Sequence, residues 1–310
     1  MKHIIILENS PRYFQLLVDN FPTTPIDLKW HIFIDTRPTN NFKSPDVTIV
    51  RSDSTNSIRE ILNTSNHPNF RVDNVILYDG WKVLFETQPA GLTNQQVEFW
   101  QLYSMSMKFA CQTYLFKILG IDQFLYLDDD VLIPRDPLPL FELGAFIQKM
   151  AFFGHVGNGK YYDEIQSIAG IKVDPVKYNK NSSCAGVMLM NRQINEALQL
   201  SIDRFYRSKF LMELYDYYKA KTTPVPYSRL FFAEQVLMNI LYTGLNYISK
   251  PTEASFMCGK RTILTPKTQK PVLIKKIPTL IHYAAGPHKH MWVDYFNSES
   301  WKISKKEANL

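Results

Sequence analysis

The sequence predicts an α/β protein with a Rossmann-like, mostly parallel sheet flanked by helices. In the first half, short β-branched runs alternate with amphipathic segments, which is typical of βαβ units. The 310 residues are 45% hydrophobic and 21% charged, a composition that can bury a full core. Near the middle, an apolar run ends in three consecutive aspartates. Ligands bind at the carboxyl ends of strands in such sheets.

The first half contains strand and helix signals in alternation. The expected strands are apolar, β-branched or aromatic runs between turn residues, at 2–7, 28–34, 47–50, 75–78 and 124–127. The expected helices have apolar residues three and four apart, at 12–20, 57–62 and 101–119. Gly120 follows the longest of these helices and predicts its end.

The second half begins near Ala151. It contains expected strands at 152–156, 187–190 and 280–283, and expected helices at 193–208 and 234–241. No repeat, low-complexity tract or clear linker separates the halves. We therefore expect one domain over 1–300, with packed halves at 1–150 and 151–300, followed by a basic C-terminal tail at 301–310.

Composition excludes several classes of protein. The net charge of +6 is spread along the chain, whereas nucleic-acid binding usually needs a dense basic stripe. The apolar runs are far shorter than the ~18 residues of a membrane span, and the N-terminal run is too short for a secretion signal. The three cysteines, Cys111, Cys184 and Cys258, are scattered, which argues against a disulfide framework or a cysteine zinc site. We expect a cytoplasmic protein.

The aspartate run Asp128-Asp129-Asp130 is the most informative feature. Two carboxylates one residue apart at a strand end can both contact a divalent cation. Mg²⁺ and Mn²⁺ prefer oxygen ligands and complete their shells with substrate phosphates. A surface turn that caps a helix is the structural alternative, but adjacent carboxylates beside apolar residues are costly without a counter-ion. The run therefore favours a metal site.

Two reaction classes fit an acidic strand end. In a phosphatase of the haloacid dehalogenase type an aspartate attacks phosphate, but that fold places its Asp-x-Asp on the first strand. In a metal-dependent transferase the cation bridges two phosphates of a nucleotide diphosphate and neutralises the departing group. The position of Asp128 in mid-chain favours the transferase.

Several separated segments, in the same order as in one known family, add to this interpretation. They surround the Asp-x-Asp strand at 125–132 and comprise 106–109, 137–142, 186–191, 234–239 and 282–289. Together they resemble GT-A glycosyltransferases of family eight, the group of glycogenin and galactinol synthase. More remotely, the chain is similar to sugar transferases of large algal viruses.

Three departures distinguish this chain from that family. Cys184-Ala185 stands where the family has Asn-Ser before the glycine, Glu234 stands where Asp is usual, and the closing motif has one extra residue between His282 and Gly286.

The resemblance implies a role for each matching residue. Asp128, Asp130 and His282 would bind Mn²⁺ or Mg²⁺, and Lys289 would stabilise the departing diphosphate. Glu234 would act on acceptor or sugar hydroxyls, and Asp79, at an earlier strand end, is a weaker candidate for sugar contact or base. The residues expected to bind the donor are Asn9, Tyr13, Lys108, Asp129, Ala185, Gly186, Gln235 and Gly286.

Each residue also has an ordinary structural interpretation. Tyr13 can pack on a helix face, His282 can be a core histidine, and Lys108 and Lys289 can be surface lysines. Glu234 can be a favourable carboxylate near a helix N-terminus.

The predicted function is a glycosyltransferase that moves a sugar from a UDP-linked donor to a hydroxyl of a glycan, glycoprotein or small carbohydrate. The 1–150 half would bind nucleotide sugar and metal, and the 151–300 half the acceptor. Retention of anomeric configuration is implied by the resemblance. The alternatives are an inverting enzyme with Glu234 or Asp79 as general base, a degenerate nucleotide-sugar-binding module, and a metal-dependent phosphatase or nucleotidyltransferase.

Overall fold

Two sheets organise the chain. The computed structural model describes residues 1–8, 10–37, 54–149, 159–180, 183–220, 233–247, 255–257, 277–283 and 289–310. A six-stranded sheet has the order β3-β2-β1-β4-β7-β6, and a three-stranded sheet has the order β5-β9-β8. The expected strands at 47–50 and 152–156, and the expected donor contacts Asn9 and Gly286, lie outside the described residues.

Four strands of the larger sheet are parallel, as the sequence predicts. β1 lies between β2 and β4, and β3 pairs with the outer edge of β2, all in parallel. β7 runs antiparallel to β4, and β6 runs antiparallel to β7. This mostly parallel sheet confirms the α/β fold class. The strands are β1 Lys2–Glu8, β2 Leu28–Ile34, β3 Val75–Asp79, β4 Phe124–Asp128, β6 Phe146–Lys149 and β7 Ser183–Met190.

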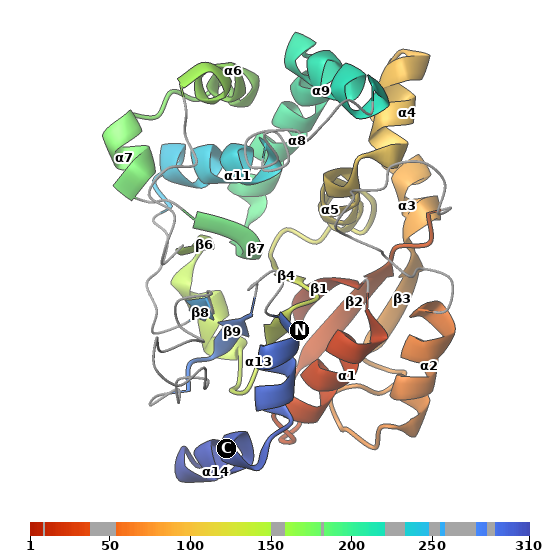
Figure 1. The fold of residues 1–310 in the computed structure, drawn as a ribbon, viewed down its shortest axis with the longest axis vertical. Helices are drawn as coiled ribbons and strands as arrows, with labels where there is room; N and C mark the ends of the chain where they lie inside the picture. The colour runs from red at the N-terminus through yellow and green to blue at the C-terminus, as the bar shows by residue number, and fades with distance from the viewer. Residues whose placement is uncertain are drawn as a thin grey trace.

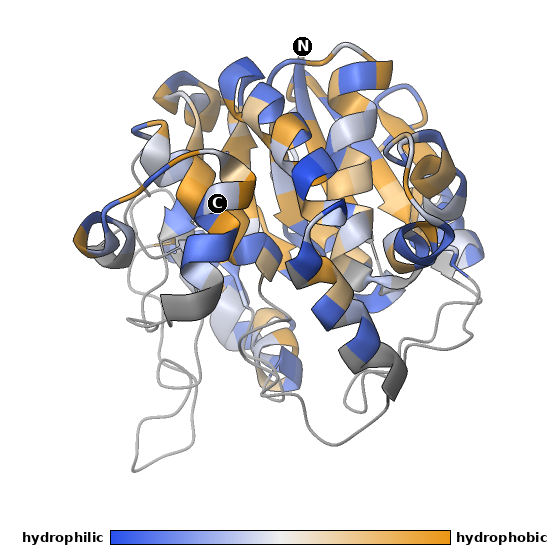
Figure 2. Cartoon of the chain, turned by 90° about the horizontal axis from the view of Figure 1, so that it is seen from above, coloured by the Kyte–Doolittle hydropathy of each residue, from blue (hydrophilic) through white to orange (hydrophobic). Residues whose placement is uncertain are grey.

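Helices cover both faces of the larger sheet, so its strands are apolar on both sides. On β1, Ile4 and Ile6 join one buried cluster while Ile5 and Leu7 join the other. The first cluster packs under α1 Pro11–Asn20, α2 Ser54–Thr64, α13 Lys289–Phe296 and α14 Glu299–Glu307. The second packs under α3 Gly80–Glu86, α5 Ser104–Thr113, α8 Arg192–Tyr206 and α11 Ala233–Gly244. Figures 1 and 2 show these layers and the hydrophobic strands between them.

The helix expected at 101–119 is broken. α4, Asn94–Leu102, ends at Tyr103, whose backbone is extended, and α5 begins at Ser104. A π-helical turn, Tyr114–Ile118, then leads to Gly120, whose φ of 67° ends the segment as predicted. The guanidinium of Arg37, itself paired with buried Asp35, donates to the Tyr103 carbonyl over 3.1 Å. This distant partner stabilises a break that local apolar spacing does not reveal.

The smaller sheet joins the C-terminal part of the chain to the aspartate run. β5, Val131–Leu132, follows Asp130 directly and pairs antiparallel with β9, Leu280–His282. β9 in turn pairs parallel with β8, Ser255–Met257. Val131 lies opposite His282, so the pairing of β5 with β9 brings the histidine beside the aspartates.

Further helices have no counterpart among the predicted elements. They are α3, α6 Gly159–Ala169, α7 Pro175–Lys180, α9 Lys209–Ala220 and α13. A 3₁₀ turn at Leu138–Leu143 lies at the segment 137–142, for which the family resemblance implies a short helix. Residues 301–310, expected as a tail, begin inside α14, where Trp301 is fully buried and its Nε1 donates to Asn20 Oδ1 over 2.7 Å. In the part of the chain that the structure describes, no helix has the length and apolarity needed to span a membrane.

Because Trp301 is buried, Trp301→Ala should destabilise the protein. We expect a loss of about 3–5 kcal/mol in the free energy of unfolding, measured by urea denaturation. Ile303→Ala on the same helix is the matched control, because Ile303 is 55% exposed and its truncation should change stability by less than about 0.5 kcal/mol. Equal effects of the two substitutions would contradict a packing role for α14.

Candidate active site

The acidic turn between β4 and β5 brings the three predicted metal ligands together. Asp128 ends β4, and Asp129 and Asp130 form the turn before β5. Asp128, Asp130 and His282 each offer a ligand atom, and these atoms lie within 4.8 Å of one another. Two carboxylate oxygens and an imidazole nitrogen form a donor set that Mn²⁺ accepts, and Mg²⁺ also takes the carboxylates.

Gly186 on β7 forms the floor of this cluster. A Cβ at this position would overlap the ring of His282 and lie 2.8 Å from Asp128 Oδ2 and 2.9 Å from His282 Nε2. The absence of a side chain therefore leaves space between two of the ligand atoms. The residues present fit a divalent cation in both donor chemistry and room.

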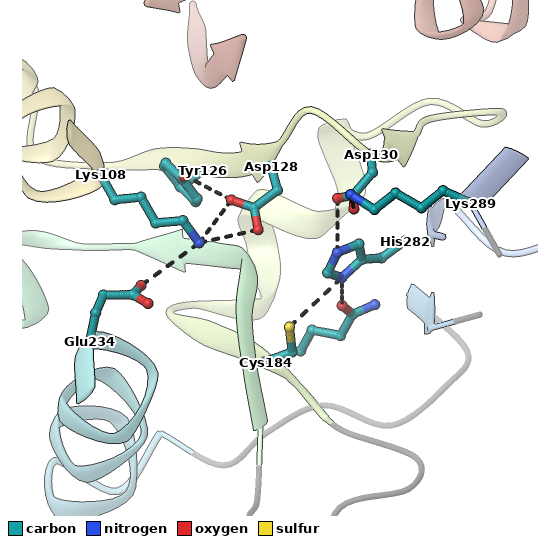
Figure 3. A network of polar contacts seen from close by, with 9 residues as sticks. Lys108, Tyr126, Asp128, Asp130, Cys184, Glu234, His282 and Lys289 are labelled. Atoms are coloured by element: carbon teal, nitrogen blue, oxygen red, sulfur yellow. Dashed lines mark hydrogen bonds and ion pairs between the residues drawn. The ribbon is translucent and has the colours of Figure 1, made fainter. Parts of the chain in front are cut away.

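On one side of the cluster, Asp130 is held by two cationic partners. Its Oδ1 lies 3.0 Å from His282 Nε2, and its Oδ2 forms an ion pair with Lys289 Nζ (Figure 3). Burial alone would raise the pKa of Asp130, but His282 and Lys289 hold it well below its usual range. Burial alone would lower the pKa of His282, but Asp130 and Cys184 raise it to about 10.

Tyr13 on α1 borders this side of the cluster. The Nζ of Lys289 lies 5.5 Å from the centre of the Tyr13 ring, and Tyr283 packs against the same ring edge to face at 5.8 Å. Tyr13 is half-buried. Tyr13, a predicted donor contact, thus lies next to Lys289, the predicted contact to the diphosphate.

On the other side, Lys108 from α5 and Tyr126 from β4 hold Asp128. The Nζ of Lys108 lies 2.9 Å from Oδ1 and 3.1 Å from Oδ2 of Asp128, and the Tyr126 hydroxyl donates to Oδ1 over 2.9 Å (Figure 3). Burial alone would lower the pKa of Lys108, but Asp128 and Glu234 raise it. Asp128 is therefore fixed and charge-compensated by its own chain.

Glu234 lies in the first turn of α11, beyond Lys108. Its Oε1 lies 4.0 Å from Lys108 Nζ and has no hydrogen-bond partner among the described residues. Burial raises the pKa of Glu234 to about 7, against the attraction of Lys108. Burial and the neighbouring Asp130 likewise raise the pKa of Asp129 to about 7. The site thus contains two carboxyl groups poised between charged and neutral forms.

Asp79 lies apart from this cluster. It caps α3, because its Oδ1 accepts from the backbone N–H groups of Trp81 at 3.0 Å and Lys82 at 3.3 Å and from the Thr36 hydroxyl. It ends β3, three strands from β4 in the sheet order, which corresponds to about 14 Å. The structure gives Asp79 a capping role and does not bring it to the metal ligands.

The remaining predicted donor contacts among the described residues lie in the protein interior. Ala185 and Gln235 are both buried, at 1% and 7% exposure, on β7 and α11.

Sequence reasoning missed three residues of the site. Tyr126 stands two positions before Asp128 on β4, so strand periodicity could have placed both on one face. Gln148 contacts His282, with 2.8 Å between Oε1 and Nδ1, and Cys184 Sγ lies 3.9 Å from the same nitrogen. No local pattern signals the last two, because tertiary pairing alone brings them to the histidine.

The chain is similar in structure to several solved glycosyltransferases. The galactosyltransferase LgtC, in complex with donor and acceptor sugar analogues, aligns over 98% of this chain and 100% of its own, with 14% identity and a TM-score of 0.47. Mouse xyloside xylosyltransferase 1 aligns over 91% and 97%, with 12% identity and a TM-score of 0.47. The bifunctional glycosyltransferase WbbM aligns over 99% of this chain and 51% of its own, with 13% identity and a TM-score of 0.47. No family model and no curated protein matches the chain.

Gly186→Ala should weaken metal binding. The added methyl group overlaps the His282 ring and approaches two ligand atoms, so we expect the Mn²⁺ dissociation constant to rise at least about tenfold, a cost of roughly 1.4 kcal/mol. Calorimetric titration with Mn²⁺ measures it. Val187→Ala is the control, because Val187 is buried in the same strand and its truncation removes core contacts without entering the cluster. A Mn²⁺ dissociation constant for Gly186→Ala within threefold of that of the unchanged protein would contradict the role of Gly186 in leaving space for the cation.

Glu234→Gln should change how stability depends on pH. The pKa of Glu234 rises on folding from 4.5 to about 7, so its contribution to stability is complete below pH 4.5 and is lost as pH rises through 7. Between pH 5 and 8 the unchanged protein should lose up to roughly 3 kcal/mol relative to Glu234→Gln. Urea denaturation across this range with a chelator present measures the difference, and parallel pH profiles would contradict the buried, neutral carboxyl.

Proposed function

We propose that this chain is a metal-dependent glycosyltransferase that moves a sugar from a UDP-linked donor to an acceptor hydroxyl. One observation carries the proposal. Asp128, Asp130 and His282 converge at the end of a central strand. The ammonium group of Lys108 pairs with Asp128, and that of Lys289 pairs with Asp130. This arrangement combines a site for a divalent cation with fixed positive charge, which suits a nucleotide diphosphate.

Asp128, Asp130 and His282 would hold Mn²⁺ or Mg²⁺. When bound, the cation would neutralise charge on the departing diphosphate. Lys289 adds a second positive charge beside Asp130, and Tyr13, next to Lys289, offers a ring on which the base can stack. The predicted contacts from Asn9, Gly286, Asp129, Ala185 and Gln235 complete the donor site in this proposal.

Glu234 and Lys108 would act on the sugar side. Glu234 is 3% exposed, and an oxygen without a hydrogen-bond partner among the described residues can accept from a sugar or acceptor hydroxyl. Lys108 holds Asp128 on one side and approaches Glu234 on the other, so it links the metal ligand to this carboxyl. We also propose membership of glycosyltransferase family eight, and retention of the anomeric configuration follows from that resemblance.

One observation favours the inverting alternative. With its pKa raised to about 7, Glu234 can accept a proton from an acceptor hydroxyl near neutral pH. The first anomer formed, observed by proton NMR, separates the two outcomes. We further propose a cytoplasmic location, a glycan, glycoprotein or small carbohydrate as the acceptor, and donor-binding and acceptor-binding halves at 1–150 and 151–300.

Donor hydrolysis with Mn²⁺ across a panel of nucleotide sugars tests the function. We expect UDP release from one donor, and Asp130→Ala should reduce its rate by roughly 10²- to 10³-fold, as loss of a key electrostatic group typically does. Asp122→Asn is the matched control, because Asp122 is partly exposed and pairs with Arg192 before β4 begins.

The other outcomes identify the alternatives. UDP binding that needs Mn²⁺ without turnover, even with acceptors added, would indicate a binding module. Release of phosphate or pyrophosphate in place of UDP would indicate the phosphatase or nucleotidyltransferase. Full activity of Asp130→Ala in the presence of a chelator would refute the metal-dependent mechanism.

A further inference from the structure

A buried glutamine contacts the far side of the candidate metal-binding histidine. Gln148, on strand β6, is 1% exposed, and its Oε1 lies 2.8 Å from His282 Nδ1. Its Nε2 has no hydrogen-bond partner among the described residues. Burying an amide is costly unless it is hydrogen-bonded, so the contact with His282 is the interaction that compensates for its burial.

An irregularity in the sheet places this glutamine. β6 and β7 pair regularly at Phe146 with Leu189 and Ile147 with Met188, but Gln148 then pairs with Cys184. The register shift skips the residues of β7 around Gly186, the same position that leaves room between the ligand atoms. The same bulge therefore contains Gly186, which leaves space between the ligand atoms, and places Gln148 in contact with His282.

The contact with Gln148 determines which nitrogen of His282 keeps its hydrogen when the ring is neutral. An amide oxygen can only accept, so Nδ1 donates its hydrogen to Oε1 of Gln148. The ring of His282 has a hydrogen on Nε2 as well, and this N–H donates to Asp130 Oδ1 over 3.0 Å. When Nε2 gives up its hydrogen to bind a cation, the acceptor at Nδ1 keeps the remaining hydrogen there, so the neutral ring is the Nδ1–H tautomer with its lone pair on Nε2. The opposite tautomer would place the proton on Nε2 and prevent that nitrogen from binding a cation.

We propose that Gln148 is a positioning residue for the metal centre, holding the Nδ1–H tautomer and ring orientation of His282 so that Nε2 is presented to the cation. This role rests on the proposed metal-dependent function. Outer-shell partners of metal-binding histidines typically change metal affinity by 10- to 100-fold when they are replaced.

The test compares Gln148→Leu, which keeps the size but removes the acceptor, with Gln148→Glu, which keeps an acceptor oxygen. We expect the Mn²⁺ dissociation constant to rise about 10- to 100-fold in Gln148→Leu and to stay within threefold in Gln148→Glu. Pulsed electron paramagnetic resonance of the Mn²⁺ complexes should show coupling to a directly bound imidazole nitrogen in the unchanged protein and in Gln148→Glu. That coupling should be weakened or lost in Gln148→Leu.

Gln112→Leu is the matched control. Gln112 is also 1% exposed, lies on α5, and its side-chain amide has no hydrogen-bond partner among the described residues. Gln112→Leu should leave the Mn²⁺ affinity and the nitrogen coupling unchanged, so a general effect of losing a buried amide is separated from loss of the histidine contact.

Two outcomes would overturn the proposal, and they differ from each other. Equal affinity and equal nitrogen coupling in Gln148→Leu and the unchanged protein would refute the role of Gln148 and leave the metal centre intact. Failure of the unchanged protein to bind Mn²⁺ at all would refute the metal-dependent function, and the role of Gln148 with it.

Discussion

The candidate site depends on the pairing of β5 with β9. β5 contains only two residues, yet its pairing with β9 places His282 opposite Val131, and the Tyr283 N–H donates to the Asp130 carbonyl over 2.9 Å. A segment from the C-terminal quarter of the chain is thereby fixed to a turn in its middle. Without these hydrogen bonds, His282 would not lie beside the carboxylates of Asp128 and Asp130. Lys289, seven residues after His282, would then not reach Asp130.

Charge compensation is the second constraint on the site. Asp130 is 3% exposed, and a carboxylate at such a depth is stable only with well-placed partners. The chain supplies those partners from its own cations, Lys289 for Asp130 and Lys108 for Asp128. The same ammonium groups have the charge that a diphosphate requires, so the groups that stabilise the turn also suit the proposed donor. Among the described residues, the cation that pairs with Glu234 is the more distant Lys108, at 4.0 Å, which fits the raised pKa of this carboxyl.

The sequence predicted the parts of the molecule that local patterns encode. The strands β1 to β4, the helices α1, α8 and α11, and the positions of Asp128 and His282 at strand ends all follow from apolar runs and their periodicity. The break at Tyr103 depends on Arg37, and local spacing contains no trace of so distant a partner. The place of Asp79 at a strand end makes it a candidate for sugar contact or base, but the same position also makes it the N-cap of α3.

The irregular pairing of β6 with β7 explains why sequence patterns do not predict the contact of Gln148 with His282. A regular antiparallel register would continue from Ile147 opposite Met188 to Gln148 opposite Val187, and would carry the glutamine away from Cys184. The bulge instead places Gln148 beside His282 Nδ1, while β4 pairs regularly with the other edge of β7 as far as Leu127 opposite Val187. Gly186 lies just beyond that pairing and within the interruption on the β6 side, so neither neighbouring strand pairs with it. The space at Gly186 therefore opens without breaking the regular part of the sheet. Bulges often lie next to active sites for this reason, and here the interruption coincides with the only glycine whose missing side chain separates two candidate metal ligands among the described residues.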